Sequence, residues 1–296
     1  MCLSTLGPGA TNLVTGLADA NMDRSPVVAI IGQGSTRRLH KESHQNMDAI
    51  GMMQPISKWA HTIYTGESVP EIVRKAFKIA EAEKPGVTVI ELPEDIAKHD
   101  VTEAPMLPVA TRRPAADHKA VKAAVELIAN AKAPIILAGN GAVRKRASTQ
   151  LRRLAVKTGI PVVNTFMGKG AVAMSDPHCL FTMGLQGRDH VNKAFAEADV
   201  VITVGYDLVE YAPSFWNADG RHKIVHIDFL PAEIDQCYPV AVDVVADLAD
   251  ALWQINEELN ARHGTLLPLF DIGQWAGLRQ TIIDDLAMEA EDESFP

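Results

Sequence analysis

PVVAIIG, residues 26–32, is an uninterrupted apolar run that ends in glycine. A run of this kind is typical of a strand that is buried on both faces of a parallel sheet. Similar short runs return later in the chain: PIILAG (134–139), PVVNTF (161–166), VVITVG (200–205), KIVHID (223–228) and VDVVAD (242–247). PGVTVIELPED (85–95) indicates a strand followed by a turn, and MCLST (1–5) is a further candidate strand.

Helical patterns separate these runs. Apolar residues recur at helical spacing over 9–22, after Ser68, and over 118–130, 145–158, 188–197 and 248–262. Ser68-Val-Pro-Glu71 matches a capping box with proline in the first turn, so we expect a helix to begin there. Strands that alternate with helices predict an α/β fold with doubly wound parallel sheets and right-handed crossovers.

A change in composition divides the chain. Residues 100–117 hold three prolines and little periodicity, which is typical of an extended linker. We therefore expect a first domain over 1–100, a linker over 101–117, a second domain over 118–262 and a tail over 263–296. One helical stretch, over about 274–290, is expected in the tail.

Composition limits the classes of binding partner and indicates the cellular compartment. The net charge of −9 and the lack of a basic stripe argue against nucleic acid as a partner. The three cysteines lie far apart, which favours a reducing, cytoplasmic setting over a disulfide framework or a metal cluster. No run of about 18 apolar residues occurs, so we expect no membrane partner.

Two glycine-rich turns are candidate ligand loops. LGPGATN (6–12) reads as a tight loop on a helix N-terminus, where an anionic or polar ligand can bind. Gly139-Asn-Gly141 follows a strand and half-matches the dinucleotide fingerprint, but Arg144 stands at the third position and no acidic residue follows about 20 positions later. That turn either binds nothing or meets a phosphate through Arg144. Gly205-Tyr-Asp207 ends another strand and is either an ordinary connection or part of a ligand crevice beyond the carboxyl ends of the strands.

Ser43-His44-Gln45-Asn46 places four hydrogen-bonding side chains in a row. Such groups are costly to bury unpaired, so they are either solvated or line a polar pocket. The nearby Gly32-Gln33-Gly34 turn and a cluster of basic residues favour the pocket. The sequence contains neither a G-x-S-x-G nucleophile elbow nor metal-ligand spacing, and no metal site is predicted.

Several strings together resemble one family. LSTLGPGATNLVTGLADANMD, GQGSTRRLHKESHQNMD, QPISKWAHTI, PIILAGNGAV, GIPVVNTFMGKG and ADVVITVGYD resemble the thiamine-diphosphate-dependent enzymes of the acetolactate synthase group. The resemblance extends to about residue 255. It implies that the first domain is part of a pyrimidine-binding domain and that the second is a Rossmann-like central domain.

The resemblance also implies site residues. The implied catalytic residues are Gln45, which would face the reacting centre, and His44 beside it. The implied cofactor contacts are Gly7, Pro8, Gly9, Asn12 and Gln33. Lys58 matches a position near the substrate channel. Gln and His suit this chemistry because they offer neutral hydrogen bonds to a developing alkoxide, while the cofactor supplies the electron sink.

The implied activity is the condensation of two pyruvates to acetolactate with release of CO2. It would need thiamine diphosphate and Mg2+, act on pyruvate or other 2-keto acids, and work as a homodimer or homotetramer. Two alternatives stay open. One is another carboligase, oxidase or decarboxylase of the superfamily, such as glyoxylate carboligase or pyruvate oxidase. The other is a non-catalytic nucleotide-binding or assembly module.

The chain departs from the family pattern in two places. Tyr206-Asp-Leu-Val-Glu-Tyr211 replaces the arginine-rich run of FAD-binding members and resembles the FAD-independent catabolic branch, although Gly184-Leu-Gln-Gly187 leaves FAD binding open. No position of this sequence matches the family's catalytic glutamate, and none matches its Gly-Asp-Gly motif. We expect the glutamate upstream of Met1 and the Mg2+ site beyond Pro296, so that this chain would be incomplete and inactive by itself.

Overall fold

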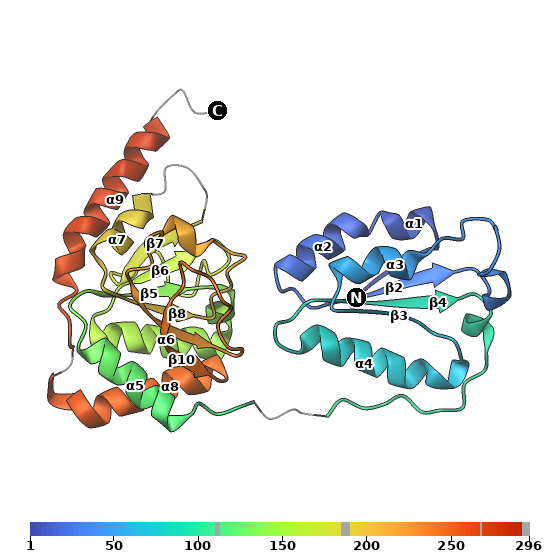
Figure 1. The fold of residues 1–296 in the computed structure, drawn as a ribbon, viewed down its shortest axis with the longest axis horizontal. Helices are drawn as coiled ribbons and strands as arrows, with labels where there is room; N and C mark the ends of the chain where they lie inside the picture. Colours follow the sequence, from blue (N-terminus) through green and yellow to red (C-terminus); the bar gives the residue numbers. More distant parts are fainter. Residues whose placement is uncertain (110–112, 185–189, 267, 292–296) are drawn as a thin grey trace. The chain divides into compact units, whose positions relative to one another are not determined.

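The computed structural model describes residues 1–109, 113–184, 190–266 and 268–291. They form two compact units, Met1–Thr111 and Arg112–Pro296. Each unit is a parallel sheet with helices on both faces (Figure 1). The α/β fold with two doubly wound sheets is therefore confirmed.

The first unit has a four-stranded parallel sheet with the order β1-β2-β4-β3. Its strands are β1 (Cys2–Ser4), β2 (Val27–Gln33), β3 (Trp59–Thr62) and β4 (Val87–Pro93). Its α-helices are α1 (Pro8–Thr11), α2 (Val14–Met22), α3 (Ala49–Met53) and α4 (Val69–Glu81).

Strand β2 shows why this sheet needs helices on both sides. Ala29 and Ile31 pack with Leu17 of α2 on one face. Val28, which directly precedes Ala29, packs on the other face with Ala76 of α4. Figure 1 shows α2 and α3 on one side of the sheet and α4 on the other. Alternate residues of the apolar run thus supply two separate cores, as expected for a strand buried on both faces.

Helix α4 begins where the sequence predicts, with Ser68 as its N-cap and Pro70 in its first turn. The predicted capping box is wrong, however. The Ser68 hydroxyl donates to the Thr65 carbonyl oxygen at 2.9 Å and makes no cap hydrogen bond. The 3₁₀ turn η3 (Gly66–Ser68) runs straight into α4 and puts Ser68 in a helical backbone conformation, from which its hydroxyl turns back along the chain.

The second unit has a six-stranded parallel sheet with the order β10-β9-β8-β5-β6-β7. Its strands are β5 (Pro134–Ala138), β6 (Val162–Thr165), β7 (Cys179–Met183), β8 (Val200–Val204), β9 (Lys223–Asp228) and β10 (Val240–Val245). Its α-helices are α5 (His118–Ala129), α6 (Lys145–Thr158), α7 (Lys193–Glu197), α8 (Leu248–His263) and α9 (Gly273–Glu291).

The two faces of this sheet differ in composition. Helices α5, α6 and α8 cover an aliphatic face, represented by Val125, Leu151 and Leu252. The other face is rich in aromatic residues, and Trp275 and Ile282 of α9 are buried in it. The helix expected within the tail region is thus present and contributes to the core of the second unit.

Candidate functional site

Two loops meet at the carboxyl end of the first sheet. The first is the turn that carries Gly7 and leads from β1 into α1. The second is Ser43–Met47, which we call the HQ loop because it holds His44 and Gln45. Gly7 has a φ of +53°, and a Cβ built on it would lie 2.3 Å from the Gln45 carbonyl oxygen. Only glycine allows the two backbones to touch in this way.

The LGPGATN turn folds as its residues predict. Pro8 is the first residue of α1, which suits its fixed φ. The Thr11 hydroxyl donates to the Pro8 carbonyl oxygen at 2.7 Å, and Asn12 caps the end of this short helix. Gly9 allows a close approach, since a Cβ there would lie 2.3 Å from Thr5 Cγ2. The side chains of Pro8 and Asn12 are exposed.

The HQ loop is anchored by Asn46, the residue directly after its central pair. The Asn46 side-chain amide donates to the carbonyl oxygens of Arg38 and Lys41, at 3.2 and 3.3 Å. Gln45 has a left-handed backbone with a φ of +56°. His44 and Gln45 themselves are exposed. These hydrogen bonds therefore leave the two side chains facing outward.

Gln33, the last residue of β2, ties the HQ loop to the sheet. Its Nε2 donates to the Met47 carbonyl oxygen at 2.9 Å and to Glu91 Oε1 at 2.8 Å, and its Oε1 accepts from the Gly34 N–H at 2.8 Å. Glu91 on β4 is buried, and its Oε2 accepts from the Thr62 hydroxyl at 2.7 Å. Because the Gln33 amide has internal partners at both ends, its geometry fits an anchor of the HQ loop better than a direct ligand contact.

Lys58 lies at the opposite end of this sheet, where the strands begin. Its N–H donates to the carbonyl oxygen of Val87, the first residue of β4, whereas Gln33 pairs with Pro93, the last. Six residues of strand separate these levels, which is about 20 Å. The Lys58 ammonium donates to the Ile79 and Ala82 carbonyl oxygens at the end of α4, both at 2.6 Å, and burial lowers its pKa. Within this unit, then, Lys58 and the HQ loop are not brought together.

In the second unit the candidate glycines lie at the switch point of the sheet. Strand β6 follows β5 on one side and β8 returns on the other, so a ligand crevice is expected between the carboxyl ends of β5 and β8. A Cβ on Gly139 would lie 2.5 Å from the Gly205 carbonyl oxygen, and one on Gly141 would lie 2.9 Å from Gly205 Cα. The Gly141 N–H also donates to the Gly205 carbonyl oxygen at 2.9 Å. Here the glycines bring two loops together.

A buried carboxylate sits against these loops. Glu210 accepts hydrogen bonds from the Asn140 N–H at 3.0 and 3.1 Å, from the Asp207 N–H at 3.0 Å, and from the Thr165 hydroxyl. Burial nevertheless raises the pKa of Glu210 to about 7, because desolvation outweighs these hydrogen bonds. The Tyr206–Tyr211 run differs from the pattern of FAD-binding members, but nothing in its sequence marks Glu210 as a functional residue.

Comparison with known protein families decides the family. Residues 1–52 match the thiamine pyrophosphate enzyme N-terminal TPP binding domain. Residues 121–255 match the thiamine pyrophosphate enzyme central domain. The chain belongs to the thiamine pyrophosphate enzymes.

Similar thiamine pyrophosphate enzymes include two archaeal proteins and a bacterial one. A probable acetolactate synthase large subunit of Methanococcus aeolicus is 37% identical over 268 residues, which cover 88% of this chain and 45% of that protein. The corresponding protein of Methanocaldococcus jannaschii is 38% identical over 268 residues, covering 85% of this chain and 44% of that protein. The acetolactate synthase of Bacillus subtilis is 34% identical over 259 residues, covering 86% and 45%. The chain thus spans a little less than half the length of these relatives.

For a thiamine pyrophosphate enzyme, the first-unit loops are chemically suitable neighbours of the cofactor's pyrimidine end. Every predicted site residue except Lys58 lies within residues 1–52, the part that matches the TPP binding domain. Asn12 and Gln45 present exposed, uncharged amides, and the Gln45 backbone lies against Gly7. Neutral donors and acceptors suit an aminopyrimidine ring. In the described ranges no group of three or more His, Cys, Asp or Glu side chains is placed to hold a metal ion.

Between β5 and β8 of this thiamine pyrophosphate enzyme, the groups that could meet a phosphate of FAD already have partners within the chain. The two loops are in backbone contact, and the Glu210 carboxylate accepts the N–H groups that would face a phosphate. The Gly184–Gly187 segment, which left FAD binding open, lies outside the described residues after Gly184.

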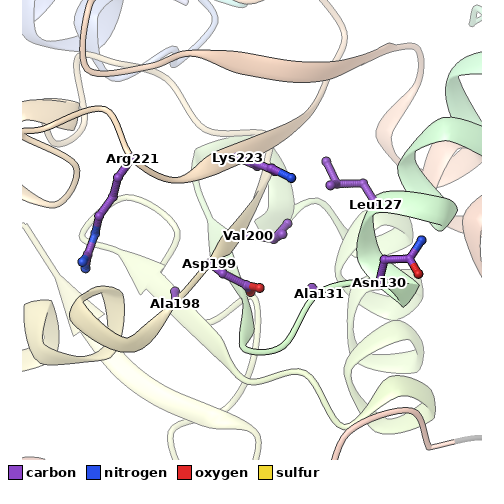
Figure 2. A pocket seen from close by; sticks show the side chains of 8 residues that line it. All are labelled: Leu127, Asn130, Ala131, Ala198, Asp199, Val200, Arg221 and Lys223. Atoms are coloured by element: carbon purple, nitrogen blue, oxygen red, sulfur yellow. The ribbon is translucent and has the colours of Figure 1, made fainter.

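A separate hollow of about 340 Å³ opens at the opposite, amino edge of the second sheet (Figure 2). Asp199 there accepts from the backbone N–H groups of Lys132 and Ala133, at 2.8 and 2.9 Å. Arg221 donates to the Ala196 carbonyl oxygen at 2.7 Å. The polar groups of this hollow therefore stabilise the connections that lead into β5 and β8, at the end of the sheet opposite the switch point.

Among the helices that the structure describes, none is long and apolar enough to cross a membrane.

Proposed function

We propose that this chain forms part of an acetolactate synthase, which joins two pyruvates and releases CO2. The observation that carries the proposal is the likeness, at 34–38% identity over 85–88% of the chain, to proteins named acetolactate synthase. The meeting of the LGPGATN turn and the HQ loop supports it, because it places polar, exposed groups in the region that matches the TPP binding domain.

In this proposal the side chains of the first unit have distinct tasks. The backbone around Gly7 and the Asn12 amide hold the pyrimidine end of thiamine diphosphate. Bound thiamine diphosphate supplies the electron sink for loss of CO2. The amide of Gln45 and the imidazole of His44 donate hydrogen bonds to the substrate oxygen as negative charge develops on it. Gln33 keeps the HQ loop in register with the sheet and makes no substrate contact.

Three further points belong to the proposal. We infer a homodimer or homotetramer, with pyruvate or a related 2-keto acid as the substrate. Mg2+ would be held by residues of the whole enzyme other than the site residues named above. A cytoplasmic setting is supported by the three free cysteines.

A chimera tests this function. The chain replaces the aligned 268 residues of the Methanocaldococcus jannaschii protein, and acetolactate formation from pyruvate is measured with thiamine diphosphate and Mg2+. We expect acetolactate, and Gln45→Ala in the chimera should lower kcat about a hundredfold because one transition-state hydrogen bond is lost. Gln54→Ala removes another exposed glutamine, seven positions after the loop, and should leave kcat unchanged.

Two results would contradict the proposal. The first is a folded chimera that binds thiamine diphosphate but releases acetaldehyde or acetate from pyruvate, or acts only on glyoxylate. The second is an active chimera in which Gln45→Ala and Gln54→Ala behave alike.

A further inference from the structure

Hydrogen-bond donors from three loops converge on one carboxylate in the second unit. The Asn140 N–H follows β5, the Thr165 hydroxyl ends β6, and the Asp207 N–H follows β8. All three donate to Glu210, which is only 9% exposed. The Thr165 oxygen in turn accepts from the Gly168 N–H at 2.8 Å, so its proton points to Glu210. The carboxylate is thus the common hydrogen-bond acceptor for donors at the carboxyl ends of β5, β6 and β8.

The same edge is where parallel sheets hold the phosphate of a nucleotide. Backbone N–H groups at the carboxyl ends of the strands usually face that phosphate, and glycines let it approach. Here a Cβ on Gly139 would lie 2.8 Å from Glu210 Oε1 and 2.5 Å from the Gly205 carbonyl oxygen. The space that glycine frees is therefore taken by the chain's own carboxylate and by the β8 loop.

We propose that Glu210 is the built-in anionic ligand of this crevice, occupying the donors that a cofactor's phosphate would need, so that no phosphate-bearing nucleotide binds between β5 and β8. The side chain links the loops after β5 and β8, which also touch each other through their glycines, to the end of β6. The position of Glu210 is set by the second unit alone. The proposal therefore does not depend on whether the acetolactate synthase reaction proposed above is correct.

Two titratable side chains of the same loop, Asp207 and Tyr206, interact electrostatically with the carboxylate. The negative charge of Asp207 opposes ionisation of Glu210. The Tyr206 hydroxyl is engaged in a hydrogen bond to the Tyr211 carbonyl oxygen. The donors named above must therefore supply the stabilisation of the ionised form.

Chemical rescue tests the assignment on the full chain. Glu210→Ala removes the carboxylate and leaves its donors facing a hole in which acetate fits. We expect the Tm at about pH 8 to fall by roughly 5–10 °C, and acetate to restore at least about 2 °C more than chloride at equal ionic strength. Glu126→Ala deletes an exposed carboxylate on α5 and should show neither effect. Titration of the unaltered chain with pyrophosphate or FAD should give no binding heat.

Binding of pyrophosphate or FAD by the unaltered chain that Glu210→Ala changes would overturn the proposal. So would a folded Glu210→Ala variant that responds to acetate no more than Glu126→Ala does. If Glu210→Ala does not fold, the pH dependence of the amide proton resonances of Asn140 and Asp207 tests the proposal instead. They should shift with one common midpoint as pH varies in the unaltered chain and stay still in Glu210→Gln. Absence of a common titration would refute the assignment.

Discussion

Glu210→Gln separates two opposing effects on a buried carboxylate. Burial in the second unit favours the protonated acid, whereas the three donors from Asn140, Thr165 and Asp207 favour the ionised form. Burial has the larger effect and raises the pKa from 4.5 to about 7. Glutamine has nearly the same volume but cannot titrate, so the substitution removes this proton-binding site from the folded state.

The sign and size follow from linkage. Between the two pKa values the folded chain binds more protons than the unfolded chain, so the free energy of unfolding falls as pH rises. The contribution of Glu210 is fully present below the unfolded pKa of 4.5 and is lost as pH passes through about 7. The shift corresponds to about 3.4 kcal/mol over the whole range, of which about 2.5 kcal/mol lies between about pH 5 and about pH 8.

Denaturant unfolding of the full chain at several pH values measures this contribution. The difference between the unaltered chain and Glu210→Gln cancels the titration of all other groups, and it should change by about 2.5 kcal/mol across that pH range. Glu126→Gln, at an exposed position of α5, serves as the control and should give a flat difference. A flat difference for Glu210→Gln would show that the donors balance burial, and one of opposite slope would show that they outweigh it; either result would refute the reasoning.

Three further substitutions test the first unit by the same unfolding assay. Gly7→Ala places a Cβ 2.3 Å from a carbonyl oxygen of the HQ loop and should cost about 1–3 kcal/mol, whereas Gly16→Ala on α2, with nothing within 4 Å, should be neutral or stabilising. Thr62→Val leaves buried Glu91 without one donor and should cost about 1–3 kcal/mol, while Thr62→Ser should keep most of the stability. Lys58→Met removes a cation from the end of α4 and should cost about 0.3–1 kcal/mol; unchanged stability would contradict that role.

The fold was largely predictable because its central strands are buried on both faces. That environment selects continuous apolar runs, and β2, β4, β5 and β8 all follow them. Strands β3 and β7 were not predicted. Each lies at the edge of its sheet and has a single neighbouring strand, so a short stretch with His61 or Thr182 suffices and no apolar run marks it.

Residues of the candidate site can be predicted only where a local motif marks them. Gly7 and the HQ pair stand in short motifs, and the structure shows their loops in contact. Glu91 and Glu210 carry no local signal, because their partners are distant in sequence. Gln33 lies 58 positions from Glu91, and Asn140 lies 70 positions from Glu210. Which loops meet at the carboxyl edge of a sheet depends on strand order, which the apolar pattern does not specify.

Both units use a buried glutamate at the carboxyl edge, but with opposite consequences. In the first unit Glu91 binds the side chains of Gln33 and Thr62, and the loop held by Gln33 keeps Gln45 exposed. In the second unit Glu210 accepts backbone N–H groups directly and so uses the donors that a ligand would need. The same device therefore supports an open edge in one sheet and closes the edge of the other. The likeness of the two folds does not imply a ligand in each, since the partners of the glutamate decide which edge can bind one.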